Sequence, residues 1–222
     1  MSYNIDIEQN SIVDETYDDT NLNKNRIPYQ IYQRSSNSFL QSNDPQEDLQ
    51  EDLYVFVKFL GRGSFGSVNL YRHTNENILV AWKEIDLNVL ESPLQNEINS
   101  EICILASLDH PNIIAYYKHF IGDNCLYIEL EYANGATLMH MIKQQKSLNQ
   151  NFPEETVMWY LYQIISAVDY IHDQQILHRD IKSLNIFSTK AGLLKLGDFG
   201  LAKRLDAFGL ANSVLNLFIF IC

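Results

Sequence analysis

Two stretches, "ILHRDIKSLNIF" (176–187) and "LKLGDFGLAK" (194–203), decide how this sequence folds. They gather carboxylate, amide and ammonium groups into one short span of chain. Transfer of a phosphoryl group to an alcohol needs a carboxylate near the attacking hydroxyl, oxygen ligands for magnesium, and positive charge on the migrating group. All three requirements are met here, so the two stretches predict a loop for phosphoryl transfer.

Each chemical role has a candidate residue in these stretches. Asp180 can accept or orient the hydroxyl proton, and Lys182 can reach the γ-phosphate. Asn185 and Asp198 carry the hard oxygen atoms that Mg²⁺ prefers. We therefore expect these four side chains to face one magnesium-bound triphosphate.

Upstream, "GRGSFG" (61–66) fits two phosphate-binding patterns that share the spacing G-x-G-x-x-G. A dinucleotide-binding turn needs a strand before the glycines and a helix after them. Here both flanks predict strands, because 54–60 is β-branched and aromatic and 67–73 alternates in character. The glycines therefore predict a hairpin flap whose backbone amides close over phosphates.

A third predicted strand, "ILVAWKEID" (78–86), carries Lys83 in its interior. One interpretation makes this lysine an edge-strand residue that discourages aggregation. The other makes it the cation that balances the triphosphate beneath the flap. Its position directly after the hairpin favours the second interpretation.

The stretch 92–108 predicts a helix that could supply an anion for this lysine. Ser92 and Gln95 form a capping box at its start. Its apolar stripe consists of Ile98, Ile102 and Leu105. Glu97 and Glu101 lie four residues apart beside that stripe, so periodicity alone allows either to pair with the lysine.

A longer helix is predicted over 153–172, from its helical spacing of apolar residues. We expect that stripe to pack in the core, and it consists of Val157, Leu161, Ile164, Ile165, Val168 and Ile171.

Composition and charge narrow the function classes. The formal net charge is −12, and residues 1–52 hold eight of these charges, with eleven acidic residues against three basic ones. That segment is rich in Asn, Gln and Ser and has no apolar periodicity, which predicts a disordered acidic tail. Net acidity without a basic stripe argues against a nucleic acid partner.

Location and membrane association are constrained by other features. We find no secretory signal at the start and no run of about 20 apolar residues, so no membrane partner is expected. The three cysteines contain no C-x-x-C pair, which is typical of a reducing compartment. We therefore expect a cytoplasmic protein.

Together these motifs resemble those of eukaryotic protein kinases. The glycine loop continues to valine (61–68), and the strand lysine, H-R-D-x-K-x-x-N (178–185) and D-F-G (198–200) follow in family order. Lys182, two residues after the H-R-D aspartate, resembles serine/threonine kinases rather than tyrosine kinases. "LNIF", Gly197 before D-F-G and "IELEYANGATL" look like NIMA-related kinases, and like one member of that family in particular.

The resemblance implies an α+β, two-lobed protein-kinase fold. It implies a complete N-lobe, with a five-stranded sheet plus one helix, and an incomplete helical C-lobe. The implied boundaries are an acidic tail at 1–53 and a kinase domain at 54–222, divided into an N-lobe (54–130), a hinge (131–135), a partial C-lobe (136–215) and an aberrant apolar end (216–222).

The same resemblance implies ATP and Mg²⁺ as cofactors and serine or threonine hydroxyls of proteins as acceptors. It selects Glu101 over Glu97 as the partner of Lys83. It also stacks four residues as a regulatory spine that aligns the two lobes, namely Leu105, Tyr116, His178 and Phe199. The catalytic residues it implies are Lys83, Glu101, Asp180 and Lys182, with Asn185 and Asp198 as metal ligands. The nucleotide contacts it implies are Leu60, Gly61, Arg62, Gly63, Ser64, Phe65, Gly66, Ser67, Val68, Ala81, Lys83, Glu131, Ala133 and Phe187.

The sequence departs from the family after D-F-G, since no Gly-Thr-Pro-Tyr or A-P-E segment appears by residue 222. We expect a truncation within the activation loop that uncovers an apolar face on the helix at 153–172. Ser213 is a candidate phosphosite by position, and the family suggests the centrosome, spindle or nucleus as further locations. Two functions stay open: an ATP-dependent serine/threonine kinase, and a non-catalytic kinase-like binding or adaptor fragment.

Overall fold

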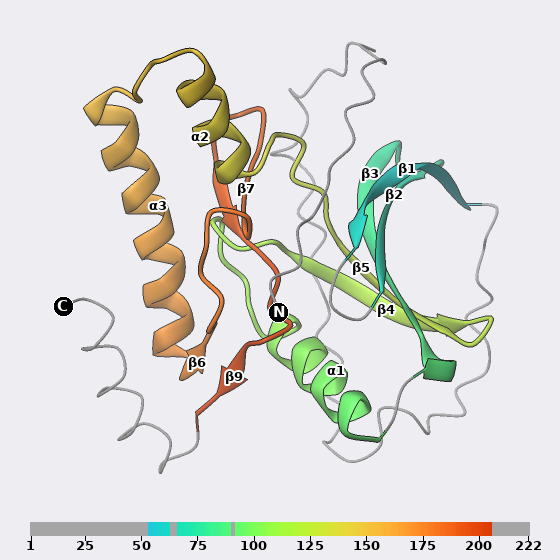
Figure 1. Ribbon diagram of the computed structural model, residues 1–222. Coiled ribbons are helices and arrows are strands. Elements are labelled where there is room, and N and C mark those ends of the chain that lie inside the picture. Colours follow the sequence, from blue (N-terminus) through green and yellow to red (C-terminus); the bar gives the residue numbers. More distant parts are fainter. Residues whose placement is uncertain (1–52, 63–65, 90–91, 206–222) are drawn as a thin grey trace. The chain divides into compact units, whose positions relative to one another are not determined.

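The computed structural model describes residues 53–62, 66–89 and 92–205 (Figure 1). All of these belong to the second of two compact units, Leu49–Cys222. The predictions for the acidic tail, the apolar end at 216–222 and Ser213 lie outside the described residues. The same holds for Gly63, Ser64 and Phe65 and for the side chains of the predicted capping box.

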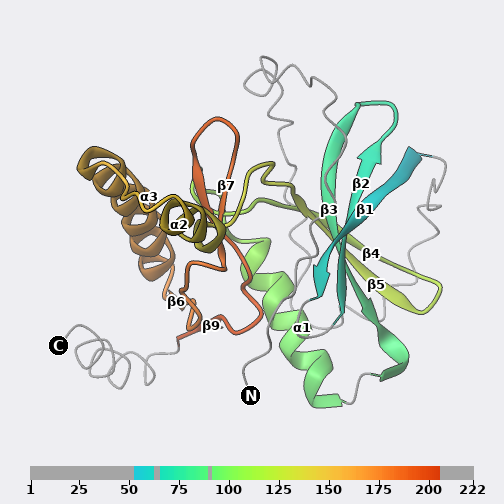
Figure 2. The ribbon, with the colours of Figure 1, turned by 45° about the horizontal axis from the view of Figure 1, so that its top comes forward.

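A five-stranded antiparallel sheet has the strand order β1-β2-β3-β5-β4. Its strands are β1 (Tyr54–Arg62), β2 (Ser67–His73), β3 (Ile78–Asp86), β4 (Tyr116–Gly122) and β5 (Cys125–Glu131). The 3₁₀ turn Leu87–Val89 and helix α1 (Ser92–Leu105) follow β3. Figures 1 and 2 both show α1 beside this sheet. The predicted N-lobe, five strands plus one helix, is thus confirmed.

Alternation along β3 gives the sheet two different faces, because successive side chains point to opposite sides. Ala81, Lys83 and Ile85 share one face, and all three are buried. Trp82 lies on the other face, where its indole N–H donates to Glu129 at 3.0 Å. The rings around it are those of Tyr54, Tyr71, Phe120 and Tyr127. The two faces therefore differ in character, with Lys83 on one and an aromatic cluster on the other.

The helical part contains α2 (Leu138–Ser147), capped by the Thr137 hydroxyl, and α3 (Glu154–Asp173). Two short ribbons accompany these helices. β6 (Ile176–Leu177) pairs with β9 (Lys203–Arg204), and β7 (Ile186–Ser188) pairs with β8 (Leu194–Leu196). The H-R-D loop thus runs from β6 to β7, and D-F-G lies between β8 and β9, so both loops are held at each end by paired strands.

Two apolar clusters form the core. The smaller one joins the sheet to α1 and contains Ile85, Ile98, Ile102, Leu126 and Ile128. The larger one joins the end of α1 to α3 and the ribbons, and contains Ile104, Leu105, Leu108, Ile113, Ala167, Ile171, Ile176, Ile186, Leu194, Leu196 and Phe199. The predicted stripe of α1 is therefore confirmed as core.

The predicted stripe of α3 is only partly correct. Its fully buried residues are Gln163, Ala167 and Ile171, and Ile164 and Val168 pack against the core. The other three predicted residues, Val157, Leu161 and Ile165, are exposed by 46 to 55%. The helix is apolar around most of its circumference, so periodicity could not identify the face that packs. Within the described residues, α3 thus has an exposed apolar face.

None of the helices within the described residues is long and apolar enough to cross a membrane.

Candidate active site

Lys83 and Glu101 form a buried ion pair between β3 and α1. The Lys83 Nζ to Glu101 Oε1 distance is 2.6 Å, and the side chains are only 8% and 3% exposed. Ile98 and Ile102, buried on either side of the glutamate, fix the register of α1 against the sheet. Glu97 is exposed, so the structure selects the partner that periodicity alone left open.

Asp198 of D-F-G converges on the same pair. A Cβ placed on Gly200 would lie 3.4 Å from Asp198 Oδ1, 3.7 Å from Glu101 Oε2 and 3.9 Å from Lys83 Nζ. Asp198 has a φ of 58°, a left-handed conformation that L-residues other than Asn and Asp rarely adopt. Three charged groups from three separate segments therefore surround one point beside a glycine.

Glu101 also offers an unused acceptor at this point. Its second oxygen, Oε2, is buried, and no hydrogen bond reaches it from the described residues. A buried carboxylate oxygen without a partner is costly unless a ligand, water or moving group completes it. The position beside Gly200 is thus suited to a polar occupant or to a shift of the D-F-G backbone.

In the loop between β6 and β7, Asp180, Lys182 and Asn185 contact one another. Lys182 Nζ lies 2.7 Å from Asp180 Oδ2. The Asn185 amide group donates to the same oxygen at 2.9 Å and to the Asp180 carbonyl at 3.0 Å. These donors orient the Asp180 carboxylate, and the amide oxygen of Asn185 is left as the atom that can bind a metal.

His178 is a structural residue and not an acid or base of the site. It is 1% exposed, its ring contacts that of Phe199 at 4.7 Å between centroids, and Nε2 lies 3.0 Å from the Gly197 carbonyl. Burial lowers its pKa, against the opposing influence of that carbonyl. Leu105 and Phe199 belong to one buried cluster with Tyr116 packed against it, in agreement with the predicted spine.

Arg179 connects the H-R-D loop to the segment after D-F-G. Its backbone has a φ of 64°, and its Nε donates to the Leu201 carbonyl at 2.6 Å. The pairing of β6 with β9 lies alongside. Both contacts hold the segment after D-F-G against the loop that carries Asp180.

Two of the residues predicted to contact the nucleotide, Val68 and Ala81, lie on the face of the sheet that carries Lys83. Val68 pairs with Lys83 across β2 and β3, and Ala81 pairs with Leu130 across β3 and β5, so all four side chains share one face. The other predicted contacts that the structure describes in or directly beside the flap strands are Leu60, Gly61, Arg62, Gly66 and Ser67. A Cβ on Gly66 would lie 1.8 Å from the Glu84 carbonyl oxygen, so this position requires glycine.

The remaining predicted nucleotide contacts are Phe187 and two residues of the hinge, Glu131 and Ala133. A Cβ on Gly197 would approach the Phe187 ring to 2.9 Å, so the residue before D-F-G must be small for this ring to lie there. The Glu131 N–H donates to the Ala115 carbonyl at 2.8 Å, and Ala133 is buried. The roles of these residues toward adenine stay predictions.

The metal site was predicted from only two protein oxygens, those of Asn185 and Asp198. Within the described residues no three His, Cys, Asp or Glu side chains gather in a way that could hold a metal ion. Mg²⁺ commonly takes one or two protein ligands and completes its shell with waters and phosphate oxygens. The donor set therefore fits Mg²⁺ delivered with a nucleotide and does not fit a metal held by protein alone.

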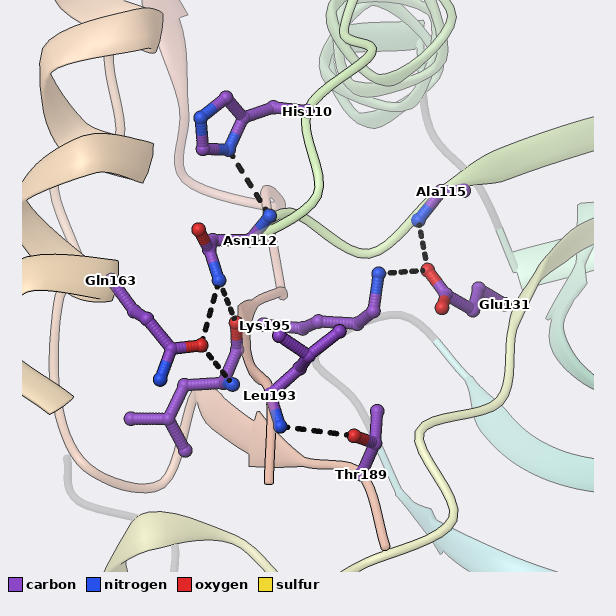
Figure 3. Close-up of polar contacts among 9 residues, drawn as sticks. His110, Asn112, Ala115, Glu131, Gln163, Thr189, Leu193 and Lys195 are labelled. Carbon is purple, nitrogen blue, oxygen red and sulfur yellow. Dashed lines mark hydrogen bonds and ion pairs between the residues drawn. The ribbon is translucent and has the colours of Figure 1, made fainter. Parts of the chain in front are cut away.

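A polar network around β8 was not predicted from the sequence (Figure 3). Gln163 Oε1 accepts from the Asn112 side chain at 2.9 Å and from the Leu194 N–H at 2.8 Å. Lys195 forms an ion pair with Glu131 at 2.8 Å. The one local signal was a charged residue inside the apolar run "LLKL", which marks a buried lysine but does not reveal its partner.

Comparison with known proteins gives concordant matches. The protein kinase domain family matches residues 54–216. Serine/threonine-protein kinase Nek9 of Mus musculus is 55% identical over 169 residues, covering 75% of this chain and 17% of that protein. Nek9 of Xenopus laevis is 54% identical over 71% of this chain and 17% of its own length. Nek3 of Mus musculus is 43% identical over 70% of this chain and 30% of its own length. The chain thus spans less than a third of each of these relatives.

Proposed function

Because this chain belongs to the protein kinase domain family, within its NIMA-related branch, we propose that it transfers the γ-phosphoryl group of ATP to serine and threonine hydroxyls of proteins. The relatives named above are serine/threonine-protein kinases, which supports this class of acceptor. A cytoplasmic location stays a prediction from the sequence.

One observation carries the proposal, namely the convergence of Lys83, Glu101 and Asp198 beside Gly200. A structural ion pair has no need of a third carboxylate at the same point, and the second oxygen of Glu101 is buried there without a hydrogen bond from the described residues. A magnesium-bound triphosphate would satisfy all three groups at once.

The residues divide the work of the reaction between them. Lys83, fixed by Glu101, would hold the phosphates of the nucleotide in register with the D-F-G carboxylate. Asp180, oriented by Lys182 and Asn185, would position the acceptor hydroxyl and take its proton. Mg²⁺, when bound through Asn185 and Asp198, would neutralise charge on the phosphates. Most of the rate enhancement then comes from positioning and charge.

The proposal is tested by phosphate transfer from labelled Mg·ATP to casein or to the protein itself. We expect Asp180→Ala to lower the transfer rate by about 10³-fold, because it removes a positioned general base. Its affinity for nucleotide should stay near that of wild type. Asp169→Ala removes an exposed aspartate of α3 and is the matched control. Label incorporation that Asp180→Ala leaves unchanged would contradict the assignment.

A second candidate function, nucleotide binding without transfer, is favoured by the exposed face of α3. This face includes Met158, Tyr162 and Ile165, each more than half exposed. A helix with one face exposed, as α3 has in the described part of the chain, supports the neighbouring loop less rigidly. Displacements of about 1 Å reduce catalysis far more than binding. This alternative predicts a melting temperature that rises with Mg·ATP and no label transfer by wild type.

A further inference from the structure

We propose that Lys195 is a positioning residue for nucleotide, which acts through its ion pair with Glu131 to hold the hinge in place for adenine (Figure 3). This inference rests on the proposed nucleotide binding. It gives a role to a residue that the motifs considered above left without one, although it lies within the stretch 194–203.

The contacts of Glu131 show how the hinge is fixed. Its Oε2 lies 2.8 Å from Lys195 Nζ and also accepts the Ala115 N–H at 3.0 Å. Its own N–H donates to the Ala115 carbonyl at 2.8 Å. The last residue of β5 is therefore held through both its backbone and its side chain, at the point where the chain leaves the sheet for the hinge.

Lys195 is an unusual residue for its position. It lies in the middle of β8, where all three residues are buried, and its side chain is only 10% exposed. Replacement of a buried ion pair by apolar residues is often neutral or stabilising, so stability alone does not explain a lysine here. A directed contact across the site does explain it, since the neighbouring Leu194 and Leu196 already supply the apolar packing.

The strand that carries Lys195 is anchored without it. Leu196 donates to the Asn112 carbonyl at 2.8 Å and accepts from the Ile114 N–H at 2.9 Å. Gln163 accepts the Leu194 N–H at 2.8 Å. Loss of the lysine side chain should therefore leave β8 and the following Asp198 in place, while the hinge loses a restraint. We therefore expect binding of the adenine ring to be impaired, while metal binding and the transfer step are unaffected.

The experiment measures binding of adenosine and of Mg·ATP to the 222-residue protein by calorimetry. We expect Lys195→Met to lower the affinities for adenosine and for Mg·ATP by a similar factor, about tenfold, because both ligands lose the same adenine anchor. In steady-state kinetics the KM for ATP should rise by that factor while kcat stays within about twofold. Lys190→Met, which removes an exposed lysine nearby on the chain, should change neither constant.

A second variant guards against misfolding of the first, since Lys195→Met leaves the Glu131 carboxylate without its cation. Glu131→Gln keeps an acceptor for the Ala115 N–H, and we expect this variant to bind adenosine more weakly as well. In the double variant, which carries both Lys195→Met and Glu131→Gln, the loss of adenosine affinity should be smaller than the product of the two single-variant losses. A double variant whose loss of adenosine affinity equals the product of the two single losses would overturn the inference. A folded Lys195→Met protein with wild-type adenosine affinity would overturn it as well.

The outcomes for the inference and for the proposed function are distinct. If wild type binds adenosine but transfers no phosphate, the proposed kinase activity fails, and the adenosine effect of Lys195→Met still supports the positioning role. If wild type transfers phosphate and Lys195→Met shows only a lower melting temperature, the function stands and Lys195 is merely structural. If wild type binds no adenosine, the inference fails.

Discussion

Two lysine–carboxylate pairs in the site have nearly equal lengths but very different surroundings. Lys83–Glu101 spans 2.6 Å with side chains 8% and 3% exposed, whereas Lys182–Asp180 spans 2.7 Å with side chains 48% and 25% exposed. The first pair lies between a buried strand and a buried helix face. The second lies in a loop that water reaches.

This difference in burial separates two tasks. A buried charge without its partner is strongly disfavoured, so the Lys83–Glu101 pair couples the position of α1 to the site and is not easily exchanged. An exposed pair contributes little and is readily broken. Lys182 can therefore leave Asp180 for an incoming phosphate at little cost. We interpret the first pair as a fixed part of the site and the second as its exchangeable part.

The largest expected effect comes from breaking the buried pair. Lys83→Met should lower the free energy of unfolding by about 3–5 kcal/mol, because Glu101 becomes an uncompensated buried charge. Phosphate transfer should fall by about 10³-fold as well. Denaturant titration measures the first quantity and label transfer the second.

A double variant separates the two contributions of that pair. Lys83→Met with Glu101→Leu removes both charges and should recover most of the stability, because apolar replacements of similar volume suit a buried site. It should recover no phosphate transfer. A double variant that is as unstable as Lys83→Met would show that packing of the lysine stem, and not charge pairing, holds this region together.

An intermediate effect is expected from pH, because burial lowers the pKa of His178 beside D-F-G. As the pH falls, the His178 ring is protonated at a higher pH in the unfolded chain, where a histidine has its ordinary pKa near 6.5, than in the folded protein. Stability from this residue is therefore present above pH 6.5 and is lost as the pH falls toward the lower, folded pKa. His119, whose pKa burial also lowers, acts in the same direction.

The loss should reach at most about 1.4 kcal/mol per pH unit for each such histidine. Denaturant titrations at pH 7.5 and 5.5 measure it. A His178→Phe protein should show a shallower dependence on pH, because its ring cannot be protonated. A wild-type stability that rises between pH 7.5 and 5.5 would contradict the neutral, structural role of His178.

The sequence was a good guide where structure depends on local pattern. The strands at 67–73 and 78–86 match the predicted bounds, and the flap reading followed from strands on both sides of the glycines. The buried stripe of α1 was predicted from its helical spacing. The choice of Glu101 over Glu97, by contrast, came from family resemblance, because both residues lie beside that stripe.

The sequence was a poor guide where structure depends on contacts between distant segments. The strands β6 and β9 have two residues each, too few for a periodic signal, and they exist because they pair with each other. The Lys195–Glu131 pair joins residues 64 positions apart in the sequence. The exposed half of α3 shows the same limit, since an apolar pattern reports which residues favour burial and not which of them find a neighbour.

The smallest stability effect is expected for the exposed pair, and it completes the comparison. Lys182→Met should change the free energy of unfolding by less than about 1 kcal/mol, because water screens both partners. Phosphate transfer should nevertheless fall by about 10²-fold, since one positioned cation is lost from the reacting phosphate. Lys143→Met removes an exposed lysine of α2 and controls for the loss of one positive charge. If Lys182→Met destabilised the protein as much as Lys83→Met, burial would not distinguish the two pairs, and the division into a fixed and an exchangeable part would be wrong.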